Sequence, residues 1–431
     1  MKLADIIGNK NLLHLERHVN EIRHSSTADY TEVGKAYHPR HGEMSFMLPV
    51  FSIDKQDANI YTARPSREAR RFIQDKGRVR FFCHPESVGD FVGEEFRSPV
   101  SYLRVAPTSS TRTVYVFRAP ELMLKTHLGK RISHFIRRLK GNSVRHSVQI
   151  SGECERMSRE KDCPKEFAYL PESVGVVHQS SDLGYLVREM QPRPHMSDRT
   201  LVPFFALYSH DSRSPQDPPL LCQLIARGPL PPLQYFERYI LRPFIKTWSY
   251  AFLARGLLFE SHGQNTLLEL DETFVPRRIV QRDFQSVPID PTIRARRGLP
   301  TPFQKHVIGR GDYPRLIEHS LQWDRFIGHC MFRSFAQFFR QEYGIPEEDF
   351  YALVRKTFRR YIPARTEKEF FPQGYVMLGA ATEGDNTCTL EYFSAPPPCR
   401  PSYGLKRENM SKSSTKYLVS HAHKRHAVSG C

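Results

Sequence analysis

Long apolar runs are absent from this 431-residue chain, and no stretch approaches the roughly 18 residues that a membrane-spanning helix needs. The first eight residues also lack the apolar core and cleavage site of a signal peptide. The eight cysteines are scattered, with no Cys-x-x-Cys pair and no zinc-finger spacing. We therefore expect a cytoplasmic protein with free thiols and no membrane partner.

Acidic residues are also in short supply, with 46 Asp and Glu against 63 Lys and Arg, for a net charge of +17. Such an excess favours anionic partners, which include nucleic acid, anionic membranes, ATP and polycarboxylates. The basic residues are spread along the chain, so charge alone does not choose among these partners. Because no zinc finger or aromatic-basic RNA motif is present, no nucleic-acid partner is expected.

Apolar periodicity predicts an α+β protein. Strands are expected at 45–53, 78–85, 100–105, 113–118, 183–189 and 201–208, with helices at 9–23, 66–74, 122–139, 233–258, 316–343 and 347–361. Ser66 is the expected N-cap of the second helix, and Pro243 should break or kink the helix at 233–258. Residues 290–298 and 300–314 are expected to form loops.

The expected architecture has several lobes. Residues 1–120 form a sheet-rich lobe, 121–230 a central lobe, 231–395 a helical lobe around a β-hairpin, and 396–431 a basic, disordered tail. A proline-rich stretch at 190–232 marks a boundary, although ordered loops would have the same composition. His421, His423 and His426 in the tail are weak candidates for metal binding.

Six residues carry most of the chemical signal. Glu260-Ser-His-Gly-Gln-Asn265 holds a carboxylate, an imidazole and two carboxamides, which are groups that can bind a nucleotide and a metal. Residues 266–270 and 277–283 then predict a β-hairpin whose midpoint is Phe274. That register puts Asn265 beside Asp283. Glu260, His262, Gln264, Asn265 and Asp283 should therefore meet at one edge; the alternative is a polar surface loop before an ordinary hairpin.

This motif resembles the signature of the NRPS-independent siderophore synthetases, the aerobactin synthetase family. The resemblance extends over roughly residues 80–290 and includes Lys125 to Ser151 and the strand Leu186-Val-Arg-Glu189. It implies a "cupped hand" fold with a helical palm and a homodimer. It also implies an ATP- and Mg²⁺-dependent ligase that adenylates a carboxylate, often citrate, and joins it to an amine or hydroxyl in siderophore biosynthesis.

The resemblance also implies roles for single residues. His262 and Arg137 would act at the α-phosphate, Arg145, Gln264 and Asn265 would bind ATP, and Glu260 and Asp283 would bind Mg²⁺. The basic run that contains Arg137 could instead be a solvated helix face. At two places the sequence departs from the family. Of the family's His-Pro-x-His-Pro-x-x-Lys pattern only His84-Pro85 is present, and Arg138 replaces a threonine.

These departures leave two alternatives open. The chain could be a catalytically degenerate family member or a basic binding protein. It could also be a kinase-like phosphotransferase, since His262-Gly263 with a nearby Asn and a later Asp resembles a kinase catalytic loop. That chemistry usually needs an Asp two residues after the His, and Gln264 stands there.

Overall fold

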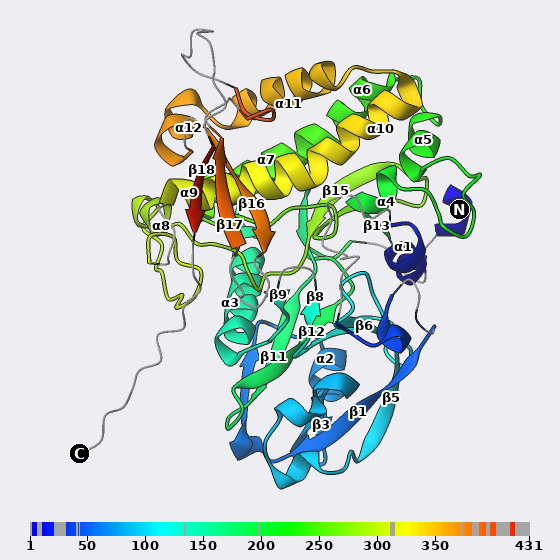
Figure 1. Ribbon diagram of the computed structural model, residues 1–431, viewed down its shortest axis with the longest axis vertical. Coiled ribbons are helices and arrows are strands. Elements are labelled where there is room, and N and C mark those ends of the chain that lie inside the picture. Colours follow the sequence, from blue (N-terminus) through cyan, green and yellow to red (C-terminus); the bar gives the residue numbers. More distant parts are fainter. Residues whose placement is uncertain are drawn as a thin grey trace.

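The computed structural model describes residues 2–6, 11–20, 32–39, 42, 44–132, 135–196, 199–310, 315–371, 374–381, 388–393, 397–401 and 414–418. Figure 1 shows a sheet-rich part at one end of the molecule, helices at the other end, and a small sheet between them. Mixed helix and strand content agrees with the α+β class expected from the sequence. No helix in these ranges is long and apolar enough to span a bilayer.

The larger sheet has nine antiparallel strands in the order β2-β11-β12-β7-β6-β5-β1-β4-β3. They are β1 (Phe46–Ile53), β2 (Ala58–Thr62), β3 (Gln74–Asp75), β4 (Arg78–Phe82), β5 (Ser101–Pro107), β6 (Thr113–Val116), β7 (Leu122–Thr126), β11 (Glu172–His178) and β12 (Leu183–Glu189). The sheet thus takes strands from both sides of residue 120, where the sequence suggested a lobe boundary.

Most elements expected in this part are present. β1, β4, β5, β6 and β12 lie where alternation and β-propensity predicted strands, and α1 (Leu12–His18) lies in the first expected helix. α2 (Arg67–Phe72) begins after Ser66, whose hydroxyl accepts a hydrogen bond from the backbone N–H of Ala69 at 3.1 Å. This N-cap was predicted from the sequence.

The helix expected at 122–139 is wrong. This segment forms β7 and then a small hairpin of β8 (Arg131–Ile132) and β9 (Phe135–Ile136). β7 lies between β6 and β12 and is buried along its whole length. Because a strand buried on both faces needs no alternation of apolar and polar residues, its sequence was mistaken for the apolar stripe of a helix. The helix comes next, as α3 (Gly141–Met157), which was not expected.

The smaller sheet has the order β10-β15-β14-β13, with β10 parallel to β15 and the other pairs antiparallel. Its strands are β10 (Phe167–Tyr169), β13 (Thr200–Pro203), β14 (Thr266–Leu270) and β15 (Pro276–Gln281). The hairpin of β14 and β15 is the one expected from the sequence. A buried cluster with Met123, Met190, Leu201, Leu267 and Val280 joins the two sheets.

Helices cover the smaller sheet and share a large aromatic core with it. They are α4 (Phe204–Tyr208), α5 (Leu220–Ile225), α6 (Pro232–Phe236), α7 (Arg242–Arg255), α8 (Pro291–Arg296), α9 (Arg315–Ser320), α10 (Arg333–Tyr343), α11 (Glu347–Tyr361) and α12 (Ala364–Phe370). α10 and α11 match expected helices. The helix expected at 233–258 is interrupted by a π-helical segment, Glu237–Leu241, and α7 begins after it. Pro243 lies in the first turn of α7, so the helix breaks next to this proline, as predicted.

Two further expectations are wrong in part. Only 201–203 of the expected strand at 201–208 is extended, as part of β13, because the chain turns into α4 at Phe204. The expected loop at 290–298 contains α8. Asp290 caps this helix by accepting hydrogen bonds from the backbone N–H groups of Thr292 (2.8 Å) and Ile293 (3.1 Å). Pro291 at the first helical position is a sequence signal that the interpretation missed.

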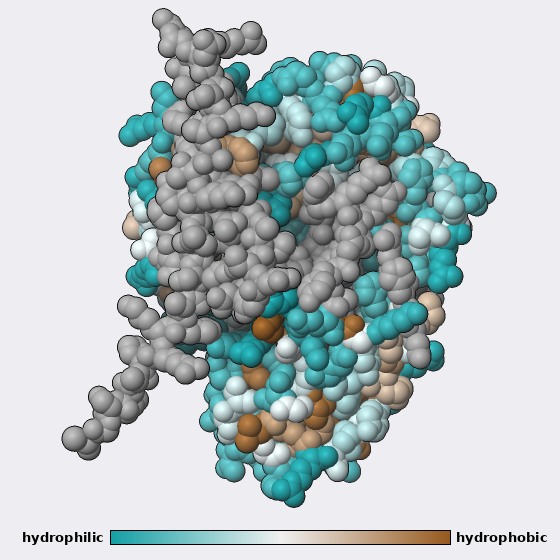
Figure 2. Space-filling model, in the orientation of Figure 1, coloured by the Kyte–Doolittle hydropathy of each residue, from teal (hydrophilic) through white to brown (hydrophobic). Residues whose placement is uncertain are grey.

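The chain after α12 forms a three-stranded sheet of β16 (Tyr375–Ala381), β17 (Cys388–Phe393) and β18 (Ser414–Leu418). β18 corrects the expectation that residues 396–431 form only a disordered tail. His421, His423 and His426 lie outside the described residues. Figure 2 shows a largely hydrophilic surface over the helical part, with apolar patches on the sheet-rich part.

Candidate active site

The motif loop, residues 260–265, connects α7 to β14. α7 ends where Gly256 adopts a left-handed conformation (φ 63°), which frees the chain to turn. Within the loop, the backbone N–H of Asn265 donates to the carbonyl of His262 (3.0 Å), and the Asn265 carboxamide donates to the carbonyl of Glu260 (3.1 Å). These bonds fix the loop as a tight turn, so that Glu260 and His262 project from a rigid backbone.

His262 is held in one tautomer. The backbone N–H of Gln264 donates to its Nδ1 at 3.2 Å, so the ring proton of the neutral form lies on Nε2. Burial, with the nearby positive charges of Arg282 and Arg137, lowers the pKa of His262 to about 4. At neutral pH the ring is therefore uncharged and offers one N–H donor, beside Oε1 of Glu260 at 3.7 Å.

Glu260 faces the same region from the start of the loop. Its side chain is 21% exposed, so it reaches the edge of the site rather than a closed core. Burial, followed by the negative charge of Asp283, raises the pKa of Glu260 to about 7, although Arg137 and Lys125 oppose this. Burial thus destabilises the charged form of Glu260, and a bound cation would stabilise it.

The hairpin register differs by one residue from the predicted register. Thr266 lies opposite Gln281, and the backbone N–H of Arg282 donates to the carbonyl of Asn265 at 3.0 Å, so that Arg282 rather than Asp283 is opposite Asn265. An irregularity beyond Glu269 shifts the pairing. Asp283 comes one position later and has a left-handed backbone (φ 67°), which ends the strand.

Asp283 lies in a buried group of charges from the larger sheet. Its Oδ1 pairs with Nζ of Lys125 at the end of β7, and its Oδ2 is 3.8 Å from Arg188 of β12. Glu172 of β11 accepts from Arg188 at 2.6 Å and from the backbone N–H of Phe284 at 3.1 Å. Burial acts to raise the pKa of Asp283, but Lys125 and Arg188 lower it well below its usual range. Asp283 is therefore a carboxylate at neutral pH.

Two more arginines complete this group. Arg112 donates to the carbonyl of Arg137 (2.8 Å) and to Oε1 of Gln285 (2.7 Å), and burial together with Arg137 lowers its pKa to about 10. Arg137 follows β9, and its charge acts on both Glu260 and Asp283. Among the residues that the structure describes, no carboxylate lies within ion-pairing distance of the Arg137 guanidinium. Arg137 is thus a cation available to an anionic ligand.

Gln264 lies in a second buried network. Its carboxamide donates to Oγ of Ser109 at 2.8 Å, and Ser109 donates through its backbone N–H to Glu16 at 3.2 Å. Glu16 also pairs with Arg282 at 2.5 Å, and Arg282 donates to the carbonyl of Gln264 at 2.9 Å. This network fixes the loop from behind and joins α1 to the hairpin.

Arg145 lies apart from these networks. It is on α3, and its guanidinium donates to Oε1 of Gln304 at 3.2 Å. The structure therefore brings together Glu260, His262, Asn265, Asp283 and Arg137, ties Gln264 to them from behind, and places Arg145 farther out. Sequence reasoning missed Lys125, Arg112, Arg188, Arg282, Glu16 and Ser109 as members of the site. Lys125, Arg188 and Arg282 were noted only as parts of segments that resemble the family.

Two protein-family models match this chain. The IucA / IucC family matches residues 97–209, and the family described as ferric iron reductase FhuF-like transporter matches residues 234–387. The first range contains Ser109, Lys125 and Arg137, and the second contains the motif loop and Asp283. The two ranges thus supply the two sides of the site described above.

Two curated relatives are a ligase and a synthase by name. The chain is 28% identical to the L-2,3-diaminopropanoate–citrate ligase of Staphylococcus aureus over 211 residues, 45% of this chain and 35% of that protein. It is 29% identical to the putrebactin synthase of Shewanella sp. over 181 residues, 42% of this chain and 27% of that protein. The matches thus span about a third of the length of these relatives.

Solved structures show the same fold. Aerobactin synthetase IucC from Klebsiella pneumoniae superposes with a TM-score of 0.62 at 16% identity, over 79% of this chain and 68% of that chain. ATP-bound aerobactin synthetase IucA from the same species gives a TM-score of 0.58 at 16% identity, over 78% and 66%. The resemblance to the siderophore synthetases that the motif predicted is confirmed.

Proposed function

We propose that this protein is an ATP-dependent synthetase of siderophore biosynthesis, which adenylates a carboxylate and condenses it with an amine or a hydroxyl. The observation that carries the proposal is the group of cations, Lys125, Arg112 and Arg137, gathered around the carboxylates of Asp283 and Glu260. Such an arrangement suits a polyphosphate and its metal, because both signs of charge are needed within one site.

In the first step, a carboxylate oxygen of the acyl donor attacks the α-phosphorus of ATP. The bond to the β-phosphate oxygen breaks, pyrophosphate leaves, and an acyl-adenylate forms. Negative charge increases on the α-phosphate oxygens in the transition state, where Arg137 and the Nε2–H of neutral His262 are the available donors. Because the hydrogen bond from Gln264 fixes the His262 ring, its donor can stabilise this charge without rearranging.

In the second step, the amine nitrogen or hydroxyl oxygen attacks the acyl carbon. AMP leaves with the electron pair of the acyl–phosphate bond, and the proton of the nucleophile passes to a base. Glu260, with a pKa raised to about 7, is a suitable acceptor near neutral pH when no metal is bound to it. The acyl donor proposed here is citrate or a related polycarboxylate, in keeping with the name of the Staphylococcus aureus relative.

Glu260 and Asp283 fit a Mg²⁺ ion. Among the described residues no three His, Cys, Asp or Glu side chains gather as a complete metal site, but Mg²⁺ bound with ATP needs only one or two protein carboxylates. The raised pKa of Glu260 means that its carboxylate form is destabilised in the free protein, and a divalent cation would stabilise that form. When bound, Mg²⁺ would neutralise phosphate charge and orient the triphosphate.

The remaining expectations stay proposals. The helical palm around the hairpin fits a cupped hand, and Gln264, Asn265 and Arg145 are proposed to help bind ATP. A homodimer is proposed, and exposed apolar side chains of β1 and β5, such as Met47 and Tyr102, offer a surface for a second copy. Dependence on ATP fits a cytoplasmic enzyme. Sedimentation would test the dimer.

The decisive assay mixes protein, ATP, Mg²⁺, a panel of carboxylates and hydroxylamine. Formation of hydroxamate with release of pyrophosphate and AMP supports the proposal. Release of ADP instead supports a phosphotransferase, and no turnover with any carboxylate or amine supports a degenerate member that only binds. The site does not favour a phosphotransferase, since Gln264 stands at the position of a kinase base and its carboxamide is hydrogen-bonded to Ser109.

A further inference from the structure

Lys305 lies in the loop after α8 and contacts the first turn of α3. Its ammonium donates a hydrogen bond to Oγ of Ser143, a buried residue in that turn. The loop is fixed by pairing on both sides of Ile289, which donates to the carbonyl of His306 (2.7 Å) and accepts from the backbone N–H of Ile308 (2.9 Å). These backbone hydrogen bonds fix the chain immediately after Lys305.

The charges that act most strongly on Lys305 are all positive. Burial of its ammonium, followed by the positive charges of Arg112, Lys125 and Lys140, lowers the pKa of Lys305 to about 8. Within the described part of the chain, no carboxylate lies within 4.0 Å of its Nζ. The first turn of a helix adds a further positive potential, because the N–H groups there point outward. Folding alone does not favour this arrangement, since like charges repel.

A bound anion would offset the repulsion among these cations. Lys125 and Arg112 already have Asp283 and Gln285 as partners, whereas Lys140 and Lys305 have no counter-charge among the described residues. A ligand with several negative groups could bind the paired cations at one end and the unpaired ones at the other. This is the chemistry expected of a second carboxylate on the acyl donor or of the terminal phosphates of ATP.

We propose that Lys305, with Lys140 and the first turn of α3, forms an oxyanion subsite that extends the candidate active site and fixes an anionic group of a substrate away from the reacting atoms. This inference rests on the proposed function for its choice of substrates. Anion binding at the subsite can be measured without any turnover of substrates.

The test is titration calorimetry with three probes, ATP–Mg²⁺, citrate and inorganic pyrophosphate, on wild type and variants. Lys305→Ala should weaken the binding of at least one probe tenfold or more, and Lys305→Arg should keep most of it. If Lys305→Ala loses affinity for citrate alone, the subsite binds the acyl donor. If it loses affinity for ATP and pyrophosphate, the subsite binds the phosphates.

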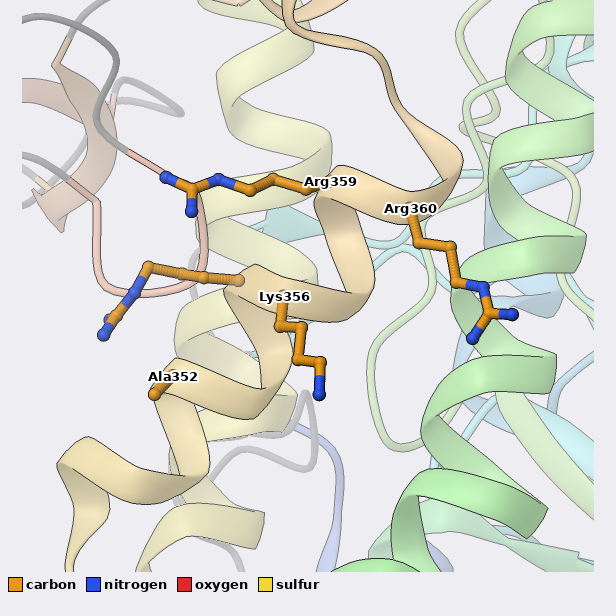
Figure 3. A pocket seen from close by; sticks show the side chains of 5 residues that line it. Ala352, Lys356, Arg359 and Arg360 are labelled. Atoms are coloured by element: carbon orange, nitrogen blue, oxygen red, sulfur yellow. The ribbon is translucent and has the colours of Figure 1, made fainter.

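The matched control is Lys356→Ala. Lys356 is exposed on α11, among basic residues that line a cavity of about 600 Å³, and none of the lining residues belongs to the candidate active site. Figure 3 shows Arg359, Arg360 and Lys356 projecting from that helix. Lys356→Ala removes one positive charge outside the proposed subsite, so it should leave the affinities for all three probes within twofold of wild type.

Equal affinities in Lys305→Ala and wild type, or wild type that binds none of the probes, would overturn the subsite. Failure of the synthetase proposal has a different signature. In that case pyrophosphate and AMP are not released with any pair of substrates, while the loss of anion affinity in Lys305→Ala is still measured.

Discussion

Nε2 of His262 lies 3.7 Å from Oε1 of Glu260, and burial drives both groups toward their neutral forms. The pKa of His262 is lowered to about 4, and the pKa of Glu260 is raised to about 7. Between these values the pair is an uncharged imidazole beside a protonated carboxylic acid, not an ion pair. Cation binding next to Glu260 would restore its charge, so metal and nucleotide are expected to change the protonation of this pair.

This relationship predicts a pH dependence of stability without ligands. Glu260 has a higher pKa in the folded state than in the unfolded state, so its favourable contribution is fully present below about pH 4.5 and is lost as pH rises through about 7. Glu260→Gln should remove this dependence and be more stable than wild type at pH 8 by on the order of 2 kcal/mol. Urea unfolding at pH 5 and pH 8 measures the difference. Exposed Glu68→Gln serves as control, and parallel curves for Glu260→Gln and wild type would contradict the prediction.

His262 is predicted to act through one N–H donor. His262→Ala should lower kcat for hydroxamate formation by roughly 100-fold or more, because a fixed donor to developing charge is lost. His262→Gln keeps a donor amide and should recover part of the rate. The measurement is hydroxamate formation with saturating ATP, Mg²⁺ and citrate, with exposed His195→Ala as control. Unchanged kcat in His262→Ala would remove His262 from the mechanism.

The sequence predicted the loop and the hairpin well, because their signals are local. Glu260 to Asn265 are neighbours in the chain, and β14 and β15 are joined by a short turn, so spacing alone brings Asp283 near. The one-residue difference in register came from the irregularity after Glu269, which no local pattern reveals.

The cations could not be predicted in the same way. Lys125 reaches Asp283 across 158 residues, and Glu16 reaches Ser109 across 93, so these contacts exist only once the two sheets are packed together. The mistaken helix at 122–139 concealed Lys125, since a central strand buried on both faces has no alternation. Asp290-Pro291, by contrast, was a readable helix start.

The ion pair of Lys125 and Asp283 is predicted to matter for both stability and binding. Lys125 is almost fully buried, so Lys125→Met leaves Asp283 without its nearest cation and should cost roughly 3 kcal/mol of unfolding free energy. It should also raise the KM for ATP. A double-mutant cycle with Asp283→Asn measures the coupling. The control cycle uses Lys246 and Glu166, a half-exposed pair at 2.9 Å that should couple by about 1 kcal/mol or less. Equal coupling in both cycles would contradict a special role for the buried pair.

Gln264 is predicted to depend on Ser109 for its orientation. The Ser109 hydroxyl accepts from the Gln264 carboxamide at 2.8 Å and donates to Glu16, so Ser109→Ala frees the carboxamide and leaves a buried carboxylate with one donor fewer. If Gln264 helps bind ATP, Ser109→Ala should raise the KM for ATP roughly three- to tenfold with little change in kcat, since the reacting groups on His262 and Arg137 remain. Steady-state kinetics with varied ATP measures this split, and the neighbouring Ser110→Ala is the matched control. A fall in kcat at unchanged KM would instead place the Ser109 network in the positioning of His262.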